Sequence, residues 1–109
     1  MVRDMVRMGL ETSGYFVLAA RDGEEALEIS RKFPSRIHAL VSDVVMPKLD
    51  GVRLRERILC ERPGIKVLLM SGTGCDLPLK EVAFLRKPFQ IEDLKTSVRK
   101  LLDLALTAP

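Results

Sequence analysis

The sequence contains few of the residues that form cross-links and zinc sites. Its 109 residues include two cysteines, one histidine, one tyrosine and no tryptophan. Cys60 and Cys75 fall in different expected elements and show neither CxxC spacing nor histidines placed as zinc ligands. We therefore expect free thiols rather than a disulfide or a zinc site. His38, just before an expected strand, is interpreted as a solvated or packed side chain rather than a phosphate donor.

Long apolar runs are also absent. No stretch approaches the roughly 20 apolar residues of a membrane-spanning helix. The amino terminus carries Arg3, Asp4 and Arg7, where a signal peptide would need an apolar stretch. The sequence has no repeats, linkers or low-complexity segments, and its 47% hydrophobic and 30% charged residues suit one small domain over residues 1–109. We expect a cytoplasmic protein with no membrane partner.

The basic residues are not gathered into one run. The net charge is +3, and the arginines and lysines are spread over several expected helices. Arg53, Arg55 and Arg57 alternate along one of these helices, and residues two apart do not share a helical face. This distribution favours a solvated surface over a nucleic-acid site, so no direct nucleic-acid partner is expected.

Helical and β-type spacing alternate along the chain. We expect helices over residues 1–14, 22–34, 51–62 and 91–105, and strands over residues 15–19, 39–42, 66–70 and 83–85. The first helix is expected to bury the stripe Val2, Met5, Val6 and Leu10. Between residues 74 and 82 at most one helical turn fits, around residues 79–82. Strands separated by amphipathic helices indicate an α/β fold with a parallel sheet covered on both faces.

Three polar side chains follow the ends of different expected strands. Asp43, Ser71 and Lys87 each stand at or just past a carboxyl end. Because such ends converge on one crevice in an open parallel sheet, we expect the three to meet there. A carboxylate can attack a phosphoryl group to form an acyl phosphate, while a hydroxyl and an ammonium bind the phosphoryl oxygens. Taken singly, Asp43 could cap a turn or helix, Ser71 could cap a turn, and Lys87 could be an exposed amine.

The motifs around these residues make the chain similar to the receiver domains of bacterial two-component response regulators, over nearly its whole length. Asp43 matches the family's phosphoacceptor, Met46-Pro47 and Asp50-Gly51 match the loop after it, Ser71 the hydroxyl position and Lys87 the lysine. Pro88 matches a proline that usually follows a cis peptide bond. The resemblance, strongest to receivers of hybrid sensor kinases, implies a flavodoxin-like, doubly wound parallel sheet and a histidine kinase or phosphotransfer protein as partner.

Phe84 matches the family's aromatic switch position, three residues before the lysine. It has no tyrosine hydroxyl, so a switch would act through ring packing alone. We expect Phe84 to belong to the core rather than to act as a switch. In the family's signalling face a fourth helix follows the hydroxyl position, and here that helix would be shortened, which puts signal output through it in doubt.

The chain departs from the family at its beginning. Receivers begin with a strand that ends in paired acids, which help to hold Mg²⁺, and no such segment precedes the first expected helix. Asp43 and the backbone carbonyl of Val45 remain as metal ligands, so we expect Mg²⁺ binding to be weak or lost and phosphorylation to be slow or absent. The missing first strand is central in the family, so its loss would leave unpaired edges. A homo-oligomer, a dimer or larger and with or without exchanged elements, is expected unless the strands close the gap.

Three function classes follow. The first is a phosphorelay receiver in which Asp43 accepts the phosphoryl group, with no enzyme activity of its own. The second is a degenerate receiver that acts as an oligomerising interaction module. The third, ranked last, is a phosphohydrolase with an aspartyl intermediate, since Val45 stands where such enzymes carry a second aspartate. Val45 and Thr73 occupy positions that vary in receivers, and an apolar Val45 is expected to hinder attacking water and prolong an acyl phosphate.

Overall fold

The computed structural model describes residues 2–45, 48–72 and 83–107. Its elements in chain order are α1 (Val2–Thr12), α2 (Gly23–Lys32), β1 (Ala39–Asp43), α3 (Gly51–Glu61), β2 (Lys66–Ser71), β3 (Ala83–Arg86) and α4 (Ile91–Thr107). The four expected helices are present, and three of the four expected strands form a sheet.

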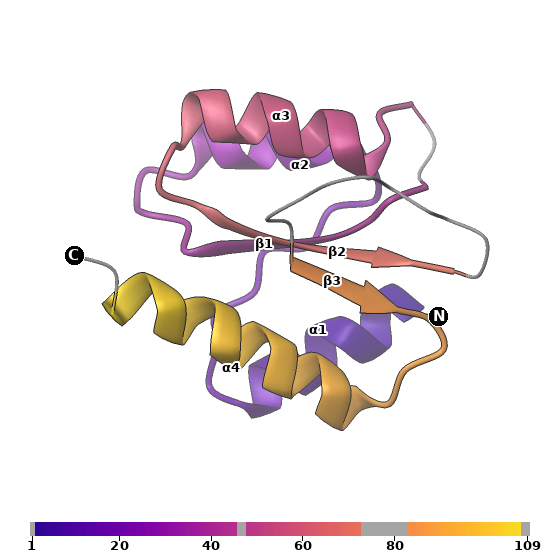
Figure 1. Ribbon diagram of the computed structural model, residues 1–109. Coiled ribbons are helices and arrows are strands. Elements are labelled where there is room, and N and C mark those ends of the chain that lie inside the picture. Colours follow the sequence, from indigo (N-terminus) through magenta and orange to yellow (C-terminus); the bar gives the residue numbers. More distant parts are fainter. Residues whose placement is uncertain (1, 46–47, 73–82, 108–109) are drawn as a thin grey trace.

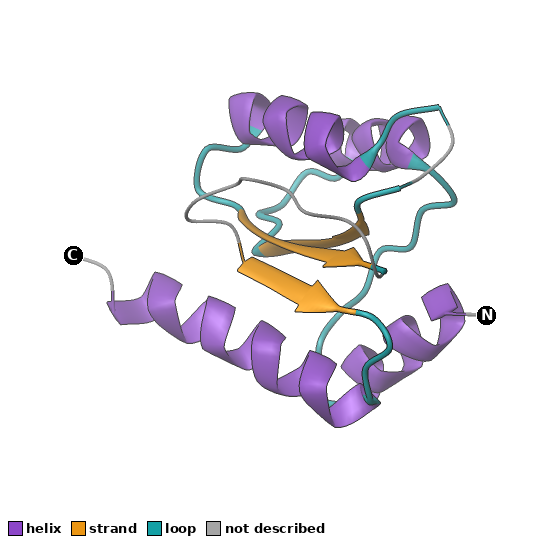
Figure 2. Cartoon of the chain, turned by 45° about the vertical axis from the view of Figure 1, so that its right-hand side comes forward, coloured by secondary structure: helices purple, strands orange, loops and turns teal. Residues whose placement is uncertain are grey.

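The sheet is parallel and has the strand order β1-β2-β3. Ala39 lies opposite Lys66 and Asp43 opposite Met70, while Ser71 lies opposite Arg86. Figures 1 and 2 show α2 and α3 on one face of this sheet and α1 and α4 on the other. The predicted α/β fold with helices on both faces is therefore confirmed. The arrangement brings the carboxyl ends of the three strands to one edge of the layer.

Two apolar clusters hold the layers together. On the α2 and α3 side the buried members are Leu27, Val44, Leu49, Leu54, Ile58, Ile65, Val67 and Leu69. On the α1 and α4 side they are Val6, Leu10, Leu68, Met70, Leu94, Val98 and Leu101. Strand β2 supplies both clusters because alternate side chains of a strand point to opposite faces. This central strand is almost wholly buried, as expected for a parallel sheet covered on both sides.

Polar groups fix the ends of α2 and α3. Asp22 and Asp50 cap the two helices, each carboxylate accepting the N–H of the residue three positions later. At the other end of α2, the guanidinium of Arg62 donates to the carbonyls of Ser30 and Phe33 at 2.7 and 2.9 Å, and to the Ser30 hydroxyl at 2.8 Å. A cation there satisfies carbonyls that the helix leaves without partners. Arg62 thus ties the end of α3 to the end of α2.

The predicted strand over residues 15–19 is wrong. These residues are not part of the sheet, although their alternation of side chains is that of a strand. Tyr15 and Val17 pack against the α1 and α4 cluster, while Phe16 is 82% exposed and stacks on Phe33. The physical reason is that a strand needs a backbone partner, and no described strand lies between this segment and β1.

Two burial predictions are also wrong. Met5 lies on the exposed side of α1 rather than in the buried stripe with Val6 and Leu10. Phe84 is 37% exposed rather than part of the core, because alternation in β3 turns its neighbours Ala83 and Leu85 toward the α1 and α4 cluster.

The remaining expectations concern the cysteines, the short helical turn and membrane-spanning helices. Cys60 is a free, exposed thiol, as predicted. The expected helical turn at residues 79–82, together with Thr73 and Cys75, lies outside the described residues. None of the helices within residues 2–107 that the structure describes combines the length and apolar character needed to cross a bilayer.

Candidate functional site

Asp43, Ser71 and Lys87 lie at the carboxyl ends of the three strands. Asp43 is the last residue of β1, Ser71 is the last residue of β2, and Lys87 directly follows β3. The backbone connects the second and third positions, since the Lys87 N–H donates to the Ser71 carbonyl at 2.6 Å. Similarly, the Val44 N–H, just past Asp43, donates to the Met70 carbonyl at 2.9 Å. These backbone hydrogen bonds between neighbouring strands therefore hold the three residues side by side at one end of the sheet.

The Asp43 carboxylate and the Lys87 amine form an ion pair through Asp43 Oδ1. Their side chains are 34% and 31% exposed, so the pair is open to a reactant on one side. Asp43 Oδ1 and Ser71 Oγ are both buried atoms, and Ser71 Oγ has no hydrogen-bond partner among the described residues. A buried hydroxyl that lacks a partner is costly and indicates a site at which another oxygen or water completes its bonding.

Gly51 lets α3 start directly against Asp43. A Cβ at this position would lie 2.1 Å from the Asp43 carbonyl oxygen and 2.9 Å from its carbon. The Gly51 N–H also donates to the Val44 carbonyl at 2.8 Å. The first turn of α3 thereby fixes the backbone that carries the carboxylate. Sequence reasoning placed Gly51 in the loop but missed this role, for which the only signal was a glycine immediately after a capping aspartate.

The loop between Asp43 and α3 is also anchored to α2. Lys48 has a positive φ of 67° and places its amine 3.7 Å from the Asp22 carboxylate. Asp22 in turn accepts the Glu25 N–H at 2.9 Å. This backbone hydrogen bond, assisted by the charge of Lys48, holds the pKa of Asp22 below its usual value. The link fixes one side of the loop that borders the Asp43 site.

The two candidate switch residues flank Lys87. Phe84 lies on β3, and Pro88 follows a cis peptide bond, as the resemblance implied. The exposed Phe84 ring is available for contact with another molecule. The contacts of the described residues do not test a switching role for either side chain, so that role stays a prediction.

Donors for a divalent cation are few at this site. Asp43 supplies a carboxylate at the carboxyl ends of the three strands. Val45 lies two residues later, and its side chain is 81% exposed. Within the described residues no group of three or more His, Cys, Asp or Glu side chains could hold a metal ion. Asp43 also already has a cation, Lys87, at one oxygen. One carboxylate and one carbonyl supply two ligands of the near-octahedral oxygen shell of Mg²⁺, so water or phosphate oxygens would have to supply the others.

Comparisons with known proteins point to one family. The model of the response regulator receiver domain matches residues 1–99. The chain is 39% identical over 110 residues to sensor kinase CckA of Brucella abortus (strain 2308), covering 92% of the chain and 12% of that protein. It is 36% identical over 109 residues to response regulator MprA of Mycobacterium leprae (strain TN), covering 93% of the chain and 46% of that protein. The chain thus spans less than half the length of these curated relatives.

Solved structures show the same architecture. A response regulator receiver domain protein from Clostridium thermocellum superposes with a TM-score of 0.82 at 29% identity, covering 94% of this chain and 86% of that one. A receiver protein from Sinorhizobium medicae WSM419 gives a TM-score of 0.84 at 22% identity, which supports the fold alone. The flavodoxin-like expectation is confirmed. The chain belongs to the response regulator receiver domain family.

Proposed function

We propose that Asp43 accepts a phosphoryl group from a histidine kinase or phosphotransfer protein in a two-component phosphorelay. The observation that supports the proposal is the ion pair between the partly exposed Asp43 carboxylate and the Lys87 amine, at the sheet end where the buried Ser71 hydroxyl has no partner among the described residues. A tetrahedral anion would satisfy both the Ser71 hydroxyl and the Lys87 charge. Cytoplasmic location belongs to the same proposal, as does the absence of enzyme activity beyond the transfer.

The transfer needs one nucleophile and two groups that bind oxygen. Asp43 Oδ2, the oxygen not engaged by Lys87, attacks the phosphorus of a phosphohistidine. The new O–P bond forms as the P–N bond breaks, and the electron pair of that bond stays with the imidazole. Lys87 then moves from the carboxylate to a phosphoryl oxygen, while Ser71 donates its hydroxyl hydrogen to another. The product is an acyl phosphate on Asp43.

Binding of Mg²⁺ is proposed to be weak, because the described residues offer few ligands for it. The remaining donors are the Asp43 carboxylate and the Val45 carbonyl, and the Lys87 amine competes for the carboxylate. Among the described residues, Lys87 and Ser71 are then the groups that offset charge on the transferring group, so we expect a slow reaction. Isothermal titration with MgCl₂ tests this point, since strong binding in wild type that is lost in Asp43→Asn would contradict it.

The test of the main proposal is chemical phosphorylation followed by intact mass measurement. Wild-type protein incubated with acetyl phosphate and MgCl₂ is expected to gain one phosphoryl mass slowly. Asp43→Asn should gain none, while Asp4→Asn, a matched change at an exposed aspartate of α1, should behave as wild type. Equal phosphorylation of wild type and Asp43→Asn would refute the assignment of Asp43.

A second candidate is a degenerate receiver that acts as an interaction module without phosphorylation. The observation that favours it is the sheet edge at β1, which has a single described neighbour, β2. In this reading copies of the chain form a homo-oligomer by exchanging elements. Sedimentation over a wide concentration range tests it, because a protein that stays monomeric at the highest concentration cannot work by self-association.

A further inference from the structure

The end of the loop that leads from β1 to α3 is held by the first turn of α2. Lys48 places its amine 3.7 Å from a carboxylate oxygen of Asp22, whose side chain is 13% exposed. The next residue, Leu49, is buried, and a Cβ added at Gly23 would lie 2.6 Å from the Leu49 carbonyl oxygen. The backbones of α2 and of the loop thus meet without a side chain between them, so a shift of one must move the other.

The same short segment also touches the phosphoacceptor. Gly51, two residues after Leu49, donates its N–H to the Val44 carbonyl at 2.8 Å. A Cβ at Gly51 would lie 2.1 Å from the Asp43 carbonyl oxygen. Residues 48–51 therefore contact α2 at one end and the last residue of β1 at the other. Because closely packed groups transmit small displacements, the place at which α2 holds the loop affects the position of Asp43.

Lys48 occupies a backbone conformation that does not favour lysine. Its φ of 67° lies in the left-handed region, which glycine adopts freely and a residue with a Cβ adopts at a cost. The ion pair with Asp22 is an interaction that offsets this cost, and glycine could not make it. A lysine at this position therefore indicates a use for its amine.

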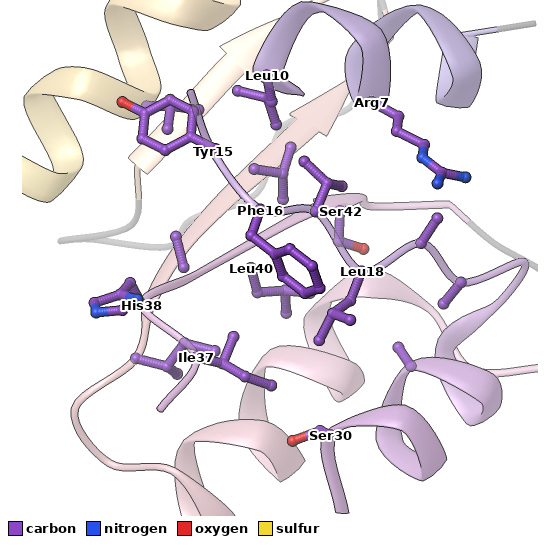
Figure 3. Close-up of a pocket in the computed structure, with 18 of the residues that line it drawn as sticks. Arg7, Leu10, Tyr15, Phe16, Leu18, Ser30, Ile37, His38, Leu40 and Ser42 are labelled. Carbon is purple, nitrogen blue, oxygen red and sulfur yellow. The ribbon is translucent and has the colours of Figure 1, made fainter. Parts of the chain in front are cut away.

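The other end of α2 is fixed by different contacts. Arg62 donates there to the hydroxyl and the carbonyl of Ser30 at 2.8 and 2.7 Å. Figure 3 shows Ser30 beside a groove next to β1, and the lining of this groove includes neither Asp22 nor Lys48. A change at Arg62 should therefore destabilise α2 without altering the contact between its first turn and the loop.

We propose that Lys48 and Asp22 are positioning residues for the phosphorylation of Asp43, an inference that rests on the proposed function. Their ion pair holds the loop so that the Asp43 carboxylate is aimed at the phosphorus of the donor. Both residues act through the loop and not on the phosphoryl group. Removing the pair therefore slows the transfer without weakening the binding of the phosphoryl donor, because a small misplacement of a reacting group lowers its rate.

The test is the rate of phosphoryl gain by the full chain, followed by intact mass over a range of acetyl phosphate concentrations with MgCl₂. Because the pair is partly exposed to water, Lys48→Met and Asp22→Asn should each lower the maximal rate only about threefold to tenfold. The half-saturating acetyl phosphate concentration should not change. The double variant should be no slower than either single variant, since both remove the same interaction. Lys48→Arg keeps the charge and should restore the rate to within about twofold of wild type.

Three further variants separate positioning from stability and from net charge. Lys48→Gly removes the amine but relieves the left-handed backbone, so its urea midpoint should stay close to wild type while its rate falls as in Lys48→Met. Arg62→Met weakens the opposite end of α2 and should keep the wild-type rate in folded protein. Lys100→Met, a matched loss of an exposed positive charge on α4, should also keep that rate. If Asp22→Asn does not fold, the Lys48 variants still decide the matter.

The outcomes distinguish this inference from the proposed function. A wild-type rate in Lys48→Met, with phosphorylation still confined to Asp43, would overturn the positioning role and leave the proposed function intact. A slow Arg62→Met would overturn it as well, because the rate would then follow stability. Additive losses in the double variant, or a slow Lys48→Arg, would show that the ion pair is not the cause. A wild-type protein that gains no phosphoryl mass, or no more than Asp43→Asn, would overturn the proposed function and this inference together.

Discussion

Gly51→Ala tests how tightly the start of α3 is packed against Asp43. The new methyl group would lie 2.1 Å from the Asp43 carbonyl oxygen and 3.0 Å from the Val44 Cα, so backbone rather than a flexible side chain must move. Overpacking of this kind costs about 1–3 kcal/mol, and the contact with backbone places Gly51→Ala near the upper end. Alanine recovers a few tenths of a kcal/mol through its better helix propensity. We expect the free energy of unfolding to fall by about 2 kcal/mol.

Urea unfolding followed by circular dichroism measures this change. With a slope typical of a small domain, a loss of about 2 kcal/mol lowers the midpoint by roughly 1–2 M. Gly64→Ala is the matched control, because nothing lies within 4 Å of a Cβ at that turn position. Its stability should stay within about 0.5 kcal/mol of wild type. Equal stability of Gly51→Ala and Gly64→Ala would show that α3 does not start as close to Asp43 as described.

Three further perturbations test other parts of the account. Asp22→Asn keeps a helix cap but cannot titrate. Because the folded pKa of Asp22 lies below its usual 3.8, the stability of the wild-type protein should fall as the pH drops through that lower value. In acid unfolding curves the variant should lose less stability over the same pH range. A variant as steep as wild type would contradict this. Arg62→Met should lower the free energy of unfolding in urea by about 2 kcal/mol through lost bonds to α2, whereas Arg57→Met should change it little, and equal effects would count against the clamp. Val45→Asn should shorten the lifetime of any acyl phosphate on Asp43 in a mass time course, and an unchanged lifetime would refute shielding by Val45.

Most of the strands and helix starts that position the site could be predicted from the sequence. Asp43, Ser71 and Lys87 each follow an apolar β-prone run, and strand ends of a parallel sheet converge, so their placement at one end of the sheet could be inferred from order alone. The start of α2 was also predictable, since the expected helix over residues 22–34 begins at the residue that caps α2, Asp22. These predictions rest on local patterns that tertiary contacts did not change.

The errors have a common physical origin. Alternating side chains over residues 15–19 report which way side chains point and say nothing about a backbone partner, so the segment was predicted as a strand that the sheet does not contain. Hydrophobic character placed Phe84 in the core, while its exposure depends on what covers that face of β3. The contacts of Arg62 with α2 join residues about thirty positions apart, and no local pattern encodes such a contact.

Locating the phosphoryl group tests the central claim most directly. Protein treated with acetyl phosphate is reduced with borohydride, which converts an aspartyl phosphate to homoserine, and is then digested and sequenced by tandem mass spectrometry. The account predicts homoserine at position 43 and at no other aspartate. Conversion at a different residue, or an unmodified Asp43 in protein that has gained a phosphoryl mass, would contradict it.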